Sequence, residues 1–112
     1  PIAVRAVQWF EKAHLERQAQ AFREKTGRDP GPGVSEDVDP HTGVRFSFTA
    51  RTFADEPPVA QLQITPPGKY HGGAWVMVRE GDWIVTFPDG RRDVVRPKVF
   101  ALEFEHIGAE QP

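Results

Sequence analysis

The sequence predicts an α+β fold: one domain over residues 1–112, with a curved, mostly antiparallel β-sheet of six to seven strands and one main amphipathic helix. A chain of 112 residues is long enough for one modest hydrophobic core and no second domain. Several short stretches alternate apolar and polar residues, whereas residues 11–26 have the spacing of a helix. Eleven prolines and ten glycines indicate many turns between these elements.

The first two elements are a strand and a helix. The side chains of the opening ten residues divide between two faces with a period of two and include β-branched residues, which predicts a strand. In residues 11–26 an apolar stripe of Leu15, Ala19 and Phe22 is surrounded by charged and amide side chains, as on a helix that packs on one side only. Residues 28–43 are rich in proline, glycine and acidic residues, and they predict a polar, flexible loop.

Three further strands are expected in the middle of the chain. Residues 44–53 and 59–65 alternate apolar with polar side chains, which is typical of half-buried strands. Residues 74–78, AWVMV, are almost all apolar and predict a central strand buried on both faces. The segments 54–58 and 66–73 between these strands contain proline or glycine and are expected to be loops.

The C-terminal part begins with a hairpin. Residues 82–87 and 91–96 form its two strands around a Pro-Asp-Gly turn. Pro97 can start a single helical turn, because a residue in the first turn needs no N–H. A last strand at residues 101–105 is expected beside the first strand, and residues 108–112 are expected to be frayed.

Composition narrows the functional classes. Fourteen Lys and Arg residues against sixteen Asp and Glu residues give a net charge of −2, so no general attraction to nucleic acid or to anionic membranes is expected. The chain has no cysteine, which excludes disulfides and thiolate sites. No apolar run approaches the roughly 20 residues of a membrane span. The absence of cysteine fits a cytoplasmic protein. The four histidines lack the spacing of metal ligands, so we expect neither a metal nor a cofactor.

Two motifs stand at opposite ends of the chain. The first strand ends in A-V-Q-W at residues 6–9. The C-terminal part contains E-G-D-W-I-V at residues 80–85, P-D-G at residues 88–90, R-P-K-V-F at residues 96–100 and F-E at residues 104–105. Together they resemble a family of small proteins encoded by bacteriophages and prophages, which has no established activity. The middle of the chain is unmatched.

The resemblance implies a shared fold and a phage origin, hence the cytoplasm of a bacterial host. Two residues depart from the family pattern, since Glu80 stands in place of the usual proline and Lys98 in place of the usual aspartate. Asp82 is expected to accept backbone N–H groups in its turn. The matched residues are interpreted as structural: Gln8, Trp9, Gly81, Asp82, Trp83, Gly90, Pro97, Phe100 and Phe104.

The function expected from these features is binding, without catalysis, to a host or phage macromolecule, with a protein as the main expectation. One candidate surface is a loop with aromatic and polar side chains, formed by Lys69, Tyr70, His71 and Trp75. The other is the basic edge of the C-terminal hairpin, formed by Arg91, Arg92, Arg96 and Lys98. That edge supports nucleic-acid binding as an alternative, although nearby aspartates can neutralise part of it. Open sheet edges also favour association into a homo-oligomer.

An enzymatic alternative rests on the first residue. Pro1, followed by a strand and a helix, resembles the opening of the tautomerase superfamily, in which the proline amine is the general base. The resemblance ends near Lys25, because that superfamily continues with a parallel strand and a hairpin, whereas this chain continues with a long polar loop. Removal of an initiator methionine is a far commoner origin of a first-position proline. Apart from Pro1, no candidate catalytic residue is expected.

Overall fold

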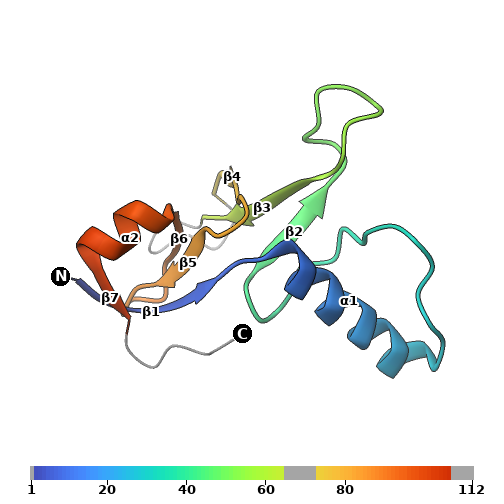
Figure 1. Ribbon diagram of the computed structural model, residues 1–112, viewed down its shortest axis with the longest axis horizontal. Helices are drawn as coiled ribbons and strands as arrows, with labels where there is room; N and C mark the ends of the chain where they lie inside the picture. Colours follow the sequence, from blue (N-terminus) through green and yellow to red (C-terminus); the bar gives the residue numbers. More distant parts are fainter. Residues whose placement is uncertain (1, 65–72, 107–112) are drawn as a thin grey trace.

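The computed structural model describes residues 2–64 and 73–106 and divides their strands between two sheets (Figure 1). The predicted α+β class with mostly antiparallel strands is confirmed. In chain order the elements are β1 (Ile2–Gln8), α1 (Glu11–Thr26), β2 (Val44–Ser47), β3 (Val59–Gln63), β4 (Trp75–Met77), β5 (Trp83–Thr86), β6 (Arg92–Val95), α2 (Pro97–Glu103) and β7 (Phe104–His106).

The larger sheet has four strands in the order β6-β5-β1-β7. Its centre is β1, which pairs antiparallel with β5 and parallel with β7, so that Ile2 is opposite Phe104. The expectation that the last strand lies beside the first is therefore confirmed. Its predicted start was wrong, because residues 101–103 continue α2, which is seven residues long instead of a single turn. Leu102 accordingly lies on the surface, 83% exposed.

The smaller sheet has three antiparallel strands in the order β2-β3-β4. The prediction of a central strand at residues 74–78 was wrong, because among the described strands β4 pairs with β3 alone and lies at the edge, with Met77 47% exposed. The outward side of β4 is partly covered by Arg45, whose guanidinium lies 3.6 Å from the centre of the Trp75 ring. The apolar residues 74–78 therefore include an edge strand in which the Trp75 side chain is covered by Arg45.

Two hydrophobic clusters lie on the two faces of the larger sheet. On one face, buried residues of β1, β5 and β6 pack against Phe100 of α2; they are Val4, Ala6, Val85 and Val95. On the other face, Ile84 and the partly buried Val7 and Val94 pack against the smaller sheet; its buried members are Val44, Phe46, Ala60 and Leu62. Strands β1 and β5 therefore supply alternate side chains to both clusters, as the period of two requires.

Helix α1 has the predicted bounds, but its contact face differs from the predicted stripe. Its one fully buried residue is His14, whereas Leu15 and Ala19 are half-buried and Phe22 is 39% exposed. The reason is geometric, since only the first turns of α1 lie against the sheets and the rest extends away from them (Figure 1). The helix ends at Gly27, which has a positive φ of 71° and donates its N–H to the carbonyl of Arg23.

Helix α2 is attached to the larger sheet by stacked aromatic rings. The ring of Phe100 is 4.2 Å from that of Trp83, with an angle of 8° between their planes. It also stacks on Phe104 at 5.8 Å. Removing the Phe100 ring would therefore leave a cavity between α2 and the sheet.

We predict that Phe100→Ala lowers the free energy of unfolding by about 3–5 kcal/mol, the usual effect of deleting a buried aromatic ring. Leu102→Ala, two residues further along the same helix, should change it by less than about 0.5 kcal/mol because Leu102 is exposed. Urea denaturation of both variants measures the difference. Equal stability losses would contradict this description of α2.

Candidate functional site

The motif residues form a structural junction. The carboxylate of Asp82 is buried and accepts hydrogen bonds from the backbone N–H of Arg79 at 2.8 Å and from Arg96 Nη1 at 2.6 Å. Its backbone carbonyl accepts from the N–H of Trp9 at 2.7 Å. The prediction that Asp82 accepts a backbone N–H in its turn is confirmed.

The same junction brings the two sequence motifs together. Gly81 has a φ of 84° and donates its N–H to the carbonyl of Trp9 at 2.9 Å, while the amide side chain of Gln8 donates to the carbonyl of Gly81 at 3.0 Å. Glu80 accepts the N–H of Glu11 through both carboxylate oxygens at 3.2 and 3.3 Å. A carboxylate at the start of a helix is favourable, so Glu80 fixes where α1 begins.

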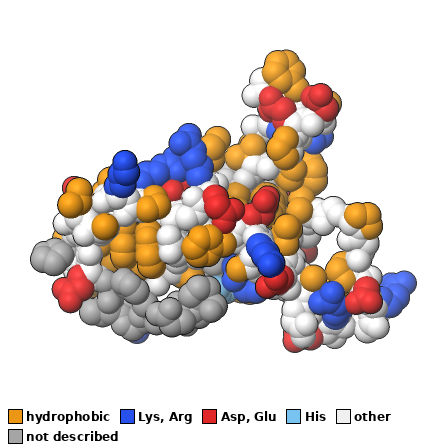
Figure 2. All heavy atoms as spheres, viewed as in Figure 1, with side chains coloured by type: hydrophobic (Ala, Val, Ile, Leu, Met, Phe, Trp, Pro, Cys, Tyr) orange, Lys and Arg blue, Asp and Glu red, His pale blue; other side chains and the backbone are white. Residues whose placement is uncertain are grey.

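The predicted basic edge is smaller in the structure than in the sequence. Arg96 pairs with Asp82, and Arg91 pairs with Asp89 at 2.9 Å. The hydrogen bond from the Arg91 backbone N–H lowers the pKa of Asp89. Figure 2 shows Lys and Arg side chains gathered over the region of α2 and β6.

Two further residues complete that edge. Arg92 is half-buried and packs over Gly43, where an added Cβ would lie 2.5 Å from Arg92 Nη1. Lys98 is exposed at the start of α2, and no carboxylate within the described ranges pairs with it. Among the described residues, neither Lys98 nor Arg92 has an ion pair, and Lys98 is the more exposed of these two cations.

The predicted recognition loop is only partly described. Trp75 is half-buried under Arg45, so one of its ring faces is already occupied. Lys69, Tyr70 and His71 lie outside the described residues, as does the candidate base Pro1. The structure therefore gives no geometry for these four residues.

A surface that sequence reasoning missed is the loop between β2 and β3, residues 48–58, which we call the display loop. It projects from the sheets in Figure 1, and Figure 2 shows an apolar side chain at its tip with acidic side chains beside it. Phe53 is 65% exposed there. The predicted strand over residues 44–53 was too long, since β2 ends at Ser47. The available signal was the acidic and proline-rich segment that follows Phe53.

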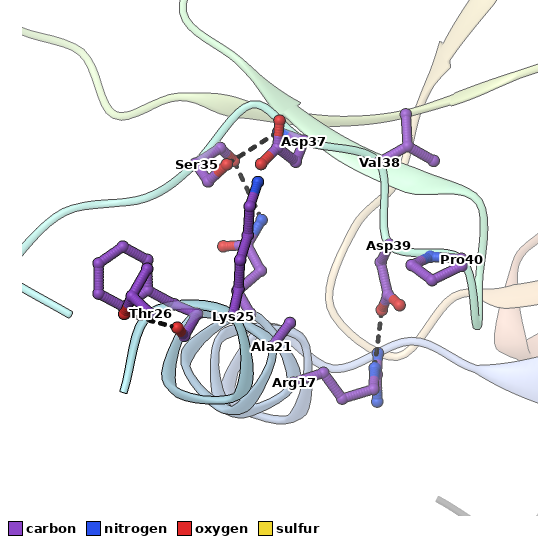
Figure 3. Close-up of a pocket in the computed structure, with 11 residues that line it drawn as sticks. Arg17, Ala21, Lys25, Thr26, Ser35, Asp37, Val38, Asp39 and Pro40 are labelled. Atoms are coloured by element: carbon purple, nitrogen blue, oxygen red, sulfur yellow. Dashed lines mark hydrogen bonds and ion pairs between the residues drawn. The ribbon is translucent and has the colours of Figure 1, made fainter. Parts of the chain in front are cut away.

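A groove lies between α1 and residues 35–40, with a volume of about 470 Å³ (Figure 3). Its apolar lining comes from Ala21, Phe22, Val38 and Pro40. The side chain of Lys25 reaches across it toward Ser35 and Asp37. A hydrogen bond from the Gln18 side chain to the carbonyl of Ser35 at 3.1 Å joins the two walls and fixes the distance between them.

A polar cluster below this groove attaches the loop to α1. His14 is fully buried, with its Nδ1 accepting from Trp9 Nε1 at 3.4 Å and lying 3.6 Å from Asp39 Oδ2. Asp39 in turn pairs with Arg17 at 2.7 Å. The sequence identified His14 only as a histidine without ligand spacing. Within residues 2–64 and 73–106, no group of three potential metal ligands is present.

Burial lowers the pKa of His14 from its ordinary value of 6.5; Asp39 opposes this effect and Arg17 adds to it. The unfolded chain then binds more protons than the folded chain below about pH 6.5. We predict that the contribution of His14 to stability is complete above that pH and is lost as the pH falls through its lowered pKa.

Urea denaturation between about pH 7.5 and about pH 5.5 tests this effect. In His14→Gln the loss of stability on acidification should be smaller than in the wild type, because the variant has no buried imidazole to protonate. An unchanged pH dependence in His14→Gln would contradict the assignment.

Comparison of the chain with models of protein families, with curated proteins and with solved structures found no match to any of them. Neither helix of the described chain has the length and apolar character needed to cross a membrane. The geometry of the display loop, the groove and the basic edge is therefore the basis on which a function can be proposed.

Proposed function

We propose that the protein is a small, non-enzymatic accessory protein of the phage type, which contacts a host or phage protein through the display loop. The observation that carries the proposal is Phe53, an aromatic side chain that is 65% exposed in the display loop, which projects from the sheets (Figure 1). Exposed apolar groups of this kind often mark interaction sites, and aromatic anchors dominate the energetics of many protein interfaces.

The display loop is held in one conformation by its own contacts. The Glu56 carboxylate accepts the N–H of Thr52 at 2.9 Å, and the backbone carbonyl of Glu56 accepts from Arg51 Nη1 at 2.8 Å. The N–H of Glu56 donates to the carbonyl of Phe53 at 3.1 Å. Because the loop is already ordered, binding would lose less conformational entropy than binding by a loose loop.

The charge around the tip indicates the chemistry of the partner. Asp55 is exposed beside Phe53, and the half-buried Glu56 follows it. An apolar cleft with lysine or arginine at its rim would complement this surface, and such pairing favours fast and selective association. The likeness of the two terminal motifs to phage-encoded proteins supports a partner in the cytoplasm of a bacterial host.

The experiment compares wild-type protein, Phe53→Ala and Leu102→Ala as baits in a bacterial lysate, with bound proteins quantified by mass spectrometry. Leu102 is an exposed apolar residue on α2 and serves as a matched control. We expect Phe53→Ala to reduce recovery of the partner at least about tenfold, the effect of losing an interface anchor. Leu102→Ala should recover it as the wild type does.

Recovery of the same proteins by Phe53→Ala would show that the display loop is not the contact. Recovery of nucleic acid alone, lost on raising the salt concentration and on Lys98→Ala, would favour the basic edge instead.

A further inference from the structure

We propose that one partner of the display loop is a second copy of the chain, with Phe53 of one copy inserted in the groove between α1 and residues 35–40 of the next. The inference rests on the proposed function of the display loop and names a partner for it. Three properties of the tip and the groove carry it: size, charge and relative position.

The size of the groove suits an aromatic side chain. Its volume of about 470 Å³ lies in the range of small-molecule pockets, and its lining is mainly apolar. Phe22 and Val38 on its two walls are 39% and 50% exposed. A phenylalanine ring placed between them would cover all three exposed apolar side chains at once, and aromatic side chains bury about 150–250 Å² each.

The tip and the groove can form one new ion pair. Arg17 and Asp39 at the inner end of the groove already neutralise each other. Lys25 and Asp37 remain, and no carboxylate in the described part of the chain lies within ion-pair distance of Lys25. Asp55 is the exposed carboxylate beside Phe53, so an inserted tip can bring it to Lys25. An ammonium group has three donors, so Lys25 can serve both Asp55 and the nearby Asp37.

The tip cannot fill the groove of its own molecule. The display loop projects beyond the smaller sheet, while the groove lies along α1 in a separate part of the molecule (Figure 1). Insertion of one copy into the next is therefore a heterologous contact, which repeats into open chains or rings unless two copies insert into each other reciprocally. Because it centres on one aromatic side chain, the interface is small and the association weak.

Two variants separate the halves of this contact. Phe53→Ala removes the tip but keeps the groove, whereas Ala21→Trp fills the groove but keeps the tip; Ala21 is exposed on α1, so the substitution does not enter the core. In sedimentation velocity at rising concentration, we expect the wild type to form increasingly large species. Each variant alone should remain monomeric.

An equimolar mixture of the two variants gives the decisive result. The intact tip of Ala21→Trp can enter the intact groove of Phe53→Ala, so the mixture should form one-to-one dimers and nothing larger. Lys25→Glu, a second groove variant that adds no bulk, should weaken assembly at least severalfold. Leu102→Ala should assemble as the wild type does.

Self-association would be disproved by a wild type that stays monomeric at every concentration, or by variants that assemble as the wild type does without mixing. The proposed function is judged separately, because loss of a captured protein on Phe53→Ala would still support it if the wild type were monomeric. Self-assembly without any captured protein would support this inference and count against the binding of a different protein by the display loop.

Discussion

The buried carboxylate of Asp82 is the interaction on which the rest of the structure depends. A carboxylate removed from water is costly unless it is paired and hydrogen-bonded, and Asp82 meets both conditions through Arg79 and Arg96. The backbone carbonyl of Asp82 accepts the N–H of Trp9, the residue that follows β1. Three segments far apart in the chain therefore meet at this residue.

This junction decides where both helices begin. Helix α1 starts two residues after Trp9, with Glu80 from the same turn at its N-terminus. Helix α2 starts directly after Arg96, whose guanidinium is bound to Asp82. Since β1 and β5 on either side of the junction supply both hydrophobic clusters, the sheets and the helices share one point of attachment. The display loop and the groove lie outside it, where substitutions can change binding without changing the fold.

Features set by local sequence could be predicted. The bounds of α1 follow from its charged composition and from Gly27, and the role of Asp82 follows from its position after a glycine in a turn. Features set by pairing between distant segments could not be predicted. The division into two sheets, the edge position of β4 and the burial of His14 depend on partners far along the chain.

The candidate surfaces show the same division. Arg91, Arg92 and Arg96 formed a basic patch in the sequence, but two of them are paired and one packs over Gly43 in the structure. The display loop was obscured because Phe48 continues the alternation of Val44 and Phe46, although β2 ends at Ser47. Exposure, not pattern, identified Phe53.

The most direct test of the Asp82 junction is a double-mutant cycle on Asp82→Ala and Arg96→Ala, measured as the free energy of unfolding in urea. The account predicts a coupling energy of about 1–3 kcal/mol, the range for a hydrogen-bonded charge pair with a buried partner. The same cycle on the exposed pair Asp89 and Arg91 should give a much smaller coupling. A coupling energy near zero for Asp82 and Arg96 would contradict the account.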